Sequence, residues 1–419
     1  MAGKDAWERR SSLFFVCFAL ASFLINASLF SASSHGDVRG QQEWGNYALK
    51  NGVASLYLRG VTDYPPIYLY VFELNSWISL TFFRTNALLS APYVFVSKTI
   101  PTIALILTGL AVYLHFRDES RKKALLGSGL IMLNPALIYN TGYWGQVDSV
   151  NTLFMVLAVI FLARKRPLLS TLSISIAVLV KIQSLILAPL IWLIIVRERG
   201  VSASLKFAAL NAVLVFLLLA PYVSSGVLGN VWSVVSGSVG YQPFVTANAY
   251  NIWFLASPRF PYQYLATLQD TTTVFGVTLR TISLVLMGAY TLFVLHRVLL
   301  KGVGATFAAA SLCLAFFMLP TEIHERYLFA FIPLAAILVV EDLRHLKVFL
   351  LFTLTHLVNL MMAYPFKSSY NLLFYPLQSI LDLIFSLDKQ AFIGVACAVA
   401  SVNIIAFIYF TRKGIADNE

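Results

Sequence analysis

The sequence has little charge and almost no cysteine. Charged residues make up 12% of its 419 residues, against roughly 25% in a soluble globular chain, while 59% are hydrophobic and the mean hydropathy is +0.77. This composition excludes a soluble domain and predicts a polytopic membrane protein. Cys17, Cys313 and Cys397 lie inside apolar runs without paired spacing, so neither a disulfide framework nor a metal site is predicted.

Motifs of nucleotide and hydrolase chemistry are also absent. The sequence contains no glycine-rich phosphate loop, Walker motif, HExxH or nucleophile elbow. The net charge of +11 would suit nucleic acid, but the basic residues stand in short clusters between apolar runs. Cytoplasmic loops of membrane proteins collect Lys and Arg in this way, so no nucleic-acid partner is predicted. The first apolar run is too long for a signal-peptide core, and we interpret it as a retained span.

Apolar runs dominate the chain, and they predict an all-α bundle of about 12 transmembrane helices in a single domain over 1–419. Several runs are shorter than the ~20 residues that a lone spanning helix needs, so we expect tilt or local bilayer thinning. The candidate spans are 12–32, 90–114, 124–141, 149–163, 168–182, 183–196, 205–223, 275–297, 304–319, 328–340, 347–364 and 392–411.

The distribution of basic residues gives the orientation. With the N-terminus inside, the predicted inner segments hold 19 of the 30 Lys and Arg residues, as the positive-inside rule requires. The longest polar stretches, 33–89, 224–274 and 365–391, then lie outside. The first contains "PPIYLYVFELNSWISLTFF", which we place in the interface because a further crossing would invert every later loop.

Short polar clusters recur along the chain, and in this topology each falls at an outer helix end or in an outer loop. They are "HGD" (35–37), "TDYPPIY" (62–68), "GYWGQVDS" (142–149), "VKIQ" (180–183), "NAYNIW" (248–253) and "TEIHERY" (321–327). Ionisable groups near spans are expensive and usually face a cavity or one another. We therefore expect one polar chamber at the outer face.

Each cluster also has a plainer interpretation. Asp37 could be a solvated loop acid or a helix cap. Asp148 could lie at a helix N-terminus, where the helix dipole stabilises a negative charge. "DYPP" fits a turn before a helix, because Pro65 pushes Tyr64 out of the helical region. Lys181 either extends to the interface or binds an anion.

The triplet His324, Glu325 and Arg326 is the strongest signal for function. It stands between two apolar runs, where burying charge costs several kcal/mol unless an interaction compensates. Arg offers a planar fork to phosphate oxygens. With Asp37 as a base, and with Tyr, Trp, Asn and Gln side chains that suit a pyranose, the clusters point to sugar transfer.

The ordered motifs "HGD…W…DYPPIYLY", "NPALIYNTGYWGQVDSVNTLF", "VKIQSLILAPL", "NAYNIW" and "PTEIHERYLF" resemble the GT-C superfamily of membrane glycosyltransferases over residues 1 to about 410. The chain is most similar to prokaryotic proteins that resemble GPI mannosyltransferases. Its "GD…W", "DYPP" and His–Glu–basic motifs also resemble dolichyl-phosphate-glucose-dependent glucosyltransferases.

The resemblance implies a sugar donor on a polyprenyl or dolichyl phosphate, and no cofactor. It implies that Asp37 is the catalytic carboxylate and that His324, Glu325 and Arg326 contact the lipid phosphate, together with Lys181. Because Val38 and Arg39 follow Asp37, no DxD or ExD pair is present, and a divalent metal is not expected. The expected sugar or acceptor contacts are Trp44, Asp63, Tyr64, Gln146, Asp148, Gln183, Asn248 and Asn251.

The expected function is inverting transfer of a hexose, with mannose favoured, to a hydroxyl of a glycan, lipid or protein acceptor. A glucosyltransferase of the same class is one alternative, and a transporter or flippase for a lipid-linked sugar is another. A purely structural scaffold does not explain the charged residues at the outer face and is the least favoured function. The compact length favours a prokaryotic plasma membrane with the site facing outside; in a eukaryote the site would face the ER lumen.

Overall fold

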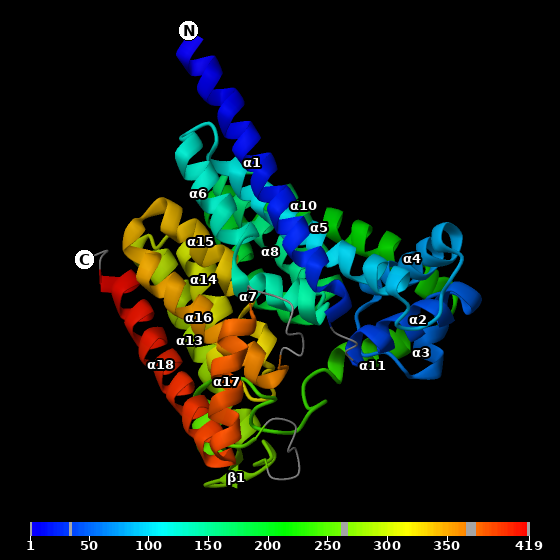
Figure 1. Cartoon of the computed structure of the whole chain (residues 1–419). Helices are drawn as coiled ribbons and strands as arrows, with labels where there is room; N and C mark the ends of the chain where they lie inside the picture. The colour runs from blue at the N-terminus through cyan, green and yellow to red at the C-terminus, as the bar shows by residue number, and fades with distance from the viewer. Residues whose placement is uncertain (1, 33–35, 261–266, 366–373, 417–419) are drawn as a thin grey trace. The chain divides into compact units, whose positions relative to one another are not determined.

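The structure is a computed structural model that describes residues 2–32, 36–260, 267–365 and 374–416 (Figure 1). It confirms an all-α polytopic membrane protein. Six helices in the described ranges are long and apolar enough to cross a membrane, and three apolar helices are shorter. The expected total of twelve spans stays a prediction, and His35 of the "HGD" cluster lies outside the described residues.

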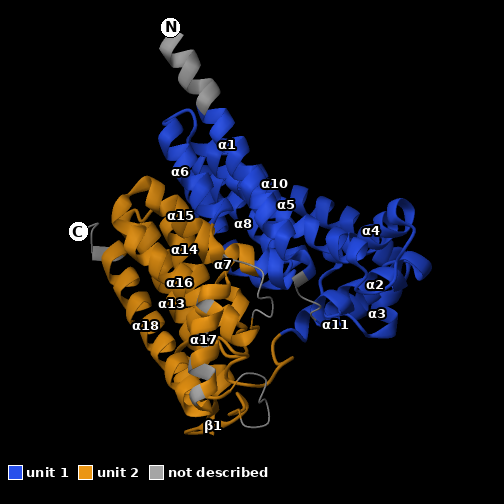
Figure 2. Ribbon diagram, viewed as in Figure 1, with its two compact units in different colours: residues 1–133, 140–238 blue, residues 134–139, 239–419 orange. Residues whose placement is uncertain are grey.

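The chain forms two compact units (Figure 2). Unit 1 comprises Met1–Leu133 and Asn140–Ser238, and unit 2 comprises Asn134–Tyr139 and Val239–Glu419. The single domain expected over 1–419 stays a prediction.

Unit 1 is built from helices joined by short turns. In chain order they are α1 (Ala2–Leu29), η1 (Phe30–Ala32), α2 (Gly36–Asn51), α3 (Ser55–Arg59), α4 (Pro66–Phe83), α5 (Ala91–Phe116), α6 (Arg121–Met132), α8 (Asp148–Ala163), α9 (Pro167–Val180), η3 (Ile182–Leu187), α10 (Ala188–Ser224) and α11 (Leu228–Ser236). A π-helical turn, Tyr139–Trp144, leads into α8. Helix α5 packs against α6 and α8, α8 packs against α9, and α2 packs against α4.

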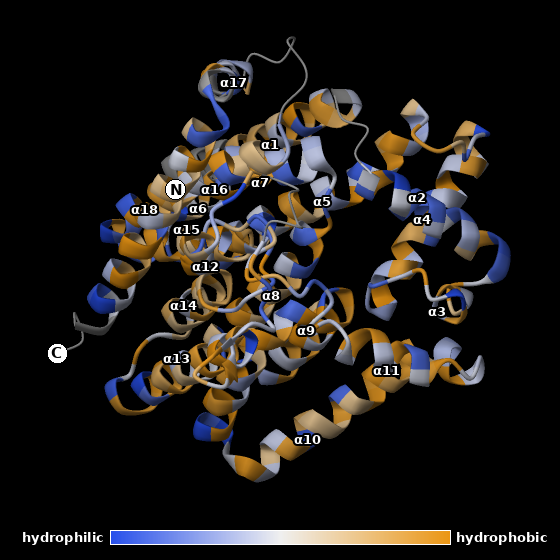
Figure 3. Ribbon diagram, turned by 90° about the horizontal axis from the view of Figure 1, so that it is seen from below, coloured by the Kyte–Doolittle hydropathy of each residue, from blue (hydrophilic) through white to orange (hydrophobic). Residues whose placement is uncertain are grey.

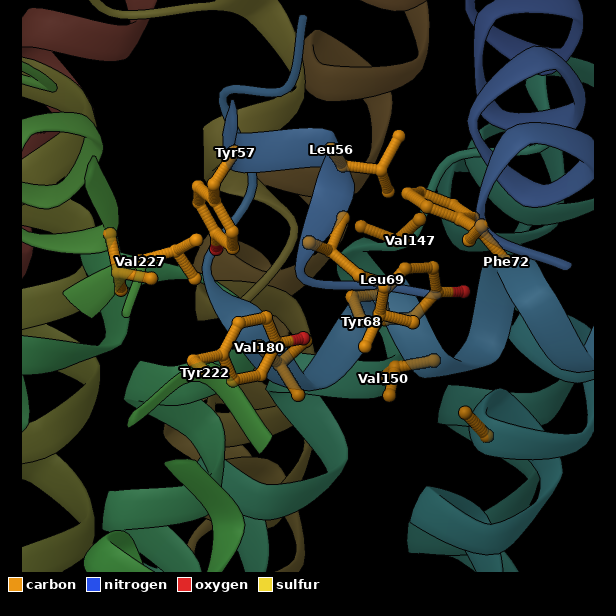
Figure 4. Close-up of a cluster of buried hydrophobic side chains, with 14 of the residues drawn as sticks. Leu56, Tyr57, Tyr68, Leu69, Phe72, Val147, Val150, Val180, Tyr222 and Val227 are labelled. Atoms are coloured by element: carbon orange, nitrogen blue, oxygen red, sulfur yellow. The ribbon is translucent and has the colours of Figure 1, made fainter. Parts of the chain in front are cut away.

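The core of unit 1 lies around α2, α3 and α4 (Figure 4). Tyr68, Leu69 and Phe72 are almost completely buried there. Helix α2 approaches α4 closely because Gly45 has no side chain: a Cβ at this position would lie 2.3 Å from the carbonyl oxygen of Phe72. This contact holds α2, which carries Asp37, against a rigid partner.

Three helix boundaries differ from the apolar runs. The run 124–141 is not one helix, because Pro135 disfavours the helical conformation at Asn134, and α6 ends at Met132. Helix α9 ends at Val180 because Lys181 is extended, with φ −150° and ψ 122°. The expected spans 183–196 and 205–223 are joined in α10, with a kink between them at Gly200, whose φ is 79°.

Unit 2 contains α7 (Pro135–Ile138), α12 (Ile252–Ala256), α13 (Leu279–Lys301), α14 (Ala305–Met318), η5 (Glu325–Leu328), α15 (Phe331–Glu341), η6 (Leu343–His345), α16 (Leu346–Ala363), α17 (Tyr375–Leu387) and α18 (Lys389–Ala416). A hairpin of β1 (Thr273–Val274) and β2 (Val277–Thr278) precedes α13. Helix α14 packs against α13, α15 and α18, and α16 packs against α15 and α18.

Large apolar side chains remain exposed along the candidate spans. On α10, Leu205, Phe216 and Leu217 are 60–64% exposed, and Figure 3 shows hydrophobic residues along this helix. In water such a surface would drive association, whereas in a bilayer it is matched by acyl chains. The exposed residues therefore agree with a membrane location.

Candidate active site

Asp37 lies in the first turn of α2, where its carboxylate accepts two hydrogen bonds. Its Oδ2 accepts from Trp144 Nε1 at 3.1 Å and from Gln146 Nε2 at 2.5 Å. Trp144 and Gln146 are buried, with 2% and 1% of their surface exposed, whereas Asp37 is exposed. Two immobile donors thus orient a carboxylate that stays accessible, which is the arrangement a general base requires.

The two donors belong to the π-helical turn and the residue pair that follows it. The amides of Gly145 and Gln146 both donate to the carbonyl of Asn140, at 3.1 and 3.0 Å. Gly145 has φ 80°, a conformation that L side chains rarely adopt, and a Cβ there would lie 2.9 Å from Val38. Glycine is therefore required for this segment to bring Gln146 to Asp37.

Lys98 of α5 also contacts this segment, and it was not among the predicted site residues. Its ammonium is fully buried and donates to the carbonyls of Tyr143 at 2.6 Å and Phe30 at 3.1 Å. These carbonyls lie just before Trp144 and at the end of α1. The signal was available, since an ionisable residue inside an apolar run is a functional candidate by default.

Asp148 and Lys181, predicted to contact sugar and phosphate respectively, form an ion pair in unit 1. Lys181 Nζ lies 2.5 Å from Asp148 Oδ1, and their side chains are 10% and 1% exposed. Asn140 Nδ2 lies 3.5 Å from the other carboxylate oxygen. The charge of Lys181 is therefore compensated within the fold, where the pair ties the extended break after α9 to the start of α8.

The remaining unit 1 candidates have different surroundings. Trp44 and Tyr64 are half-buried and pack edge to face, with ring centroids 5.8 Å apart, against the hydrophobic core. Asp63 is exposed. Gln183 is half-buried in η3. Trp44 and Tyr64 therefore have a packing role beside any contact with sugar.

In unit 2 the predicted triplet comes together. Arg326 Nη1 lies 3.1 Å from Glu325 Oε1 and 3.3 Å from His324 Nδ1. Glu325 is 2% exposed, while the side chains of His324 and Arg326 are each 16% exposed. The buried carboxylate thus orients the guanidinium, which in turn donates to the imidazole. Both side chains are partly exposed, a combination suited to an anion.

The two predicted asparagines organise the backbone beside the triplet. Asn251 caps α12 by accepting from Trp253 N at 3.1 Å, and donates to the carbonyl of Phe317 at 3.0 Å. Asn248 has φ 70°, and its carbonyl accepts from Asn359 Nδ2 at 2.8 Å. Isolated backbone bridges join Ala247 and Asn248 to His324. Asn251 therefore acts as a cap, and Asn248 places the chain next to His324.

Unit 2 contains a second charged cluster, whose residues were not predicted from the sequence to lie together. Arg280 donates to both carboxylate oxygens of Asp270 at 2.9 Å, and its Nε lies 3.2 Å from Glu322. Glu322 also accepts from the backbone amides of Gly240 and Gln242. Burial, and then the nearby carboxyl of Asp270, raise the pKa of Glu322 to about 7. The cluster joins the 240–242, 270 and 322 segments to α13.

The described residues offer no group of three or more His, Cys, Asp or Glu side chains placed to hold a metal ion. The carboxylates in both units are instead committed to Trp, Gln, Lys, Arg or backbone donors. The expectation of metal-independent chemistry stays a prediction.

Comparison with known proteins places the fold. No family model and no curated protein sequence matches this chain. The crystal structure of ArnT from Cupriavidus metallidurans bound to undecaprenyl phosphate is similar, with a TM-score of 0.50 and 12% identity, covering 96% of this chain and 77% of that one. The likeness shows that this chain has a fold like that of the ArnT structure, and the resemblance to the GT-C superfamily stays a prediction. The closer resemblance to GPI mannosyltransferases stays a prediction.

Proposed function

We propose that this protein is a membrane glycosyltransferase that moves a sugar from a polyprenyl-phosphate donor to a hydroxyl acceptor. The observation that carries the proposal is the Asp37 carboxylate, held in the first turn of α2 by two buried donors. The likeness in fold supports it, because the similar ArnT structure has undecaprenyl phosphate bound.

The proposed reaction is a single displacement. Asp37 takes the proton of the acceptor hydroxyl as its oxygen forms a bond to the anomeric carbon. The bond from that carbon to the phosphate oxygen breaks, and polyprenyl phosphate leaves with the electron pair. The sugar is transferred with inversion. A positioned base typically contributes about 10²–10⁴-fold to the rate.

The leaving phosphate needs cations, and unit 2 supplies the best candidates. Arg326 supplies the positive charge and is oriented by Glu325. Because its guanidinium donates to His324 Nδ1, His324 is a neutral hydrogen-bond donor through Nε2. Lys181 is a weaker candidate, because its ammonium is already paired with Asp148. Stabilising the charge that develops on a leaving group is usually the largest single contribution to catalysis. Arg326 is thus the residue whose loss should resemble that of Asp37.

Mannose is the sugar we favour, on the sequence motifs alone, and glucose is the alternative within the class. Trp44, Asp63, Tyr64, Gln146, Asp148, Gln183, Asn248 and Asn251 remain the proposed sugar or acceptor contacts. Among them, the contact of Gln146 with Asp37 connects it most directly to the proposed base. The acceptor is a hydroxyl of a glycan, lipid or protein, and the site faces the outside of a prokaryotic plasma membrane.

The test uses purified protein in proteoliposomes with radiolabelled polyprenyl-phosphate-mannose or -glucose and a panel of acceptors. We expect labelled acceptor and free polyprenyl phosphate from the wild type. Asp37→Asn should abolish transfer while donor binding stays near normal. Glu43→Gln is the matched control, because this exposed acid lies on the same helix and pairs with Arg39. Full activity in Asp37→Asn would refute the assignment of the base.

The competing function is translocation of a lipid-linked sugar without chemistry. Transporters are expected to carry polar residues at the middle of the membrane and to have related halves. The same assay separates the two functions. A transporter would move labelled donor between leaflets without releasing polyprenyl phosphate, whereas a transferase must release it.

A further inference from the structure

Helices α16 and α18 enclose an apolar groove within unit 2. The two helices lie side by side (Figure 1), and the groove has a volume of about 270 Å³. Leu351, Val402, Ile405 and Ala406 form its walls, while Lys347 and Tyr409 lie at one end. Both helices are candidate membrane spans, so this groove opens toward acyl chains rather than water.

The end of the groove carries cations without matching acids. Lys347 is exposed and forms no ion pair or hydrogen bond with any residue that the structure describes. Lys413 donates to the hydroxyl of Tyr409 at 3.3 Å and lies 5.6 Å from the centre of its ring. The nearby Asp342 is already paired with Arg344 at 2.5 Å. An anion at Lys347 would therefore meet an uncompensated ammonium beside a phenol donor.

The orientation predicted from the sequence puts this end in the cytoplasmic leaflet. Arg344, Lys347, Arg412 and Lys413 belong to two of the inner segments of that topology. Basic pockets between transmembrane helices on this side are suited to anionic lipid head groups. The observations supply each part of such a site: apolar walls for a chain, and at one end a cation and a hydroxyl.

We propose that the α16–α18 groove binds one anionic phospholipid of the cytoplasmic leaflet. One acyl chain lies along Leu351, Val402 and Ile405, and the phosphate contacts Lys347 with the Tyr409 hydroxyl. The site is independent of the proposed transfer reaction, because none of its residues belongs to the candidate active site. Its role is to stabilise the packing of α18 on α16.

The test is native mass spectrometry of the full-length protein in detergent, titrated with phosphatidylglycerol or phosphatidylcholine. We expect one phosphatidylglycerol to bind more tightly than phosphatidylcholine and to raise the unfolding temperature. Lys347→Gln should weaken that first binding about fivefold, the effect of one cation near an anionic lipid surface. Lys347→Arg should preserve it.

Matched variants separate the site from general charge and from general packing. Lys206→Gln removes an exposed inner-end lysine of α10 and should leave the first binding unchanged. Val402→Phe fills the groove from an exposed position and should weaken binding, while Leu350→Phe, exposed on α16 outside the groove, should not. Equal losses of affinity for the first phosphatidylglycerol in Lys206→Gln and Lys347→Gln would overturn the proposal. So would phosphatidylcholine binding as tightly as phosphatidylglycerol, or a preference for undecaprenyl phosphate over both.

Discussion

At the scale of single residues, the environment of Asp37 explains how a surface carboxylate can act as a directed base. Two side chains that donate to it, Trp144 and Gln146, are buried, so the carboxylate is held by groups packed inside the fold. Orientation of this kind has a measurable value, because a misplacement of ~1 Å can cost about 10²-fold in rate. The donors therefore act on catalysis through geometry.

Replacing Gln146 tests that geometry. Gln146→Leu removes one donor to a charged oxygen, an interaction of about 1.5–3 kcal/mol. We expect kcat for sugar transfer to fall at least tenfold, while KM for the lipid donor changes little. The control is Asn51→Leu, which removes an exposed amide of α2 that contacts only a local carbonyl. A fall in both variants, or an equal rise in KM, would assign Gln146 to folding or binding.

Individual polar residues could be predicted from the sequence better than their partners. Asp37, Gln146, Asp148 and Lys181 all stood out, because polar residues beside apolar runs are costly. The pairing of Asp148 with Lys181 did not, since it depends on where α9 breaks. Lys98 was missed because its acceptors are backbone carbonyls, which no side-chain pattern records.

At the scale of elements, the segment from Asn140 to Gln146 in unit 1 tolerates little change in its backbone. It combines a π-helical turn, a glycine at positive φ and a bond to buried Lys98. The sequence predicted a helix through part of this segment, because its apolar residues continue the preceding run. The glycines and Pro135 were the local signals against that helix.

Gly145→Ala tests whether this turn must approach α2. We expect lower stability, by at least about 1 kcal/mol from the positive φ, plus strain from the contact with Val38 at 2.9 Å. The rate of sugar transfer should fall by a larger factor than the loss of folded protein explains, because Val38 is next to Asp37 in the sequence. The control is Gly52→Ala, which has the same φ of 80° and open space around its Cβ. If both variants lose the same stability and activity, close approach is irrelevant.

The late polar motif also divides into two elements with different roles. Glu322 turns toward Arg280 and the 240–242 amides, whereas Glu325 turns toward Arg326. The sequence placed both acids in one cluster, because they are only three residues apart. Glu322 has a positive φ of 65°, a backbone conformation that L residues other than glycine seldom adopt.

The Glu322 cluster should make stability depend on pH. The pKa of this carboxyl is raised from 4.5 to about 7 in the folded protein, mainly by burial. Between these values the folded state holds a proton that the unfolded state has released, so rising pH disfavours folding across this window. We expect the unfolding temperature of the wild type, relative to Glu322→Gln, to fall from pH 5 to pH 8. The unfolding temperature of the control Glu198→Gln, which alters an exposed acid, should change with pH as that of the wild type does. If the unfolding temperature of Glu322→Gln also changed with pH as in the wild type, the assignment to Glu322 would be wrong.

At the scale of the whole molecule, the hydrophobic pattern was sufficient for the fold class and insufficient for the number of crossings. Long runs such as those of α5, α13 and α18 match candidate spans closely, because each holds a continuous apolar helix. Shorter runs do not settle a crossing: α8, α9 and α14 have 14–16 residues, below the ~20 that a lone helix needs. Their placement depends on neighbours, which a linear pattern does not contain.

The predicted orientation can be measured directly with single cysteines. In a Cys17→Ser background, we expect Asp63→Cys and Thr271→Cys to react with a membrane-impermeant maleimide on intact cells, since both are exposed and lie in predicted outer loops. Lys206→Cys and Lys301→Cys, at predicted inner ends, should react only after the membrane is opened. Cys313 is buried and supplies the unreactive reference. Labelling of Asp63→Cys and Lys206→Cys from the same side would overturn the topology, and with it the outward-facing Asp37 on which the proposed reaction depends.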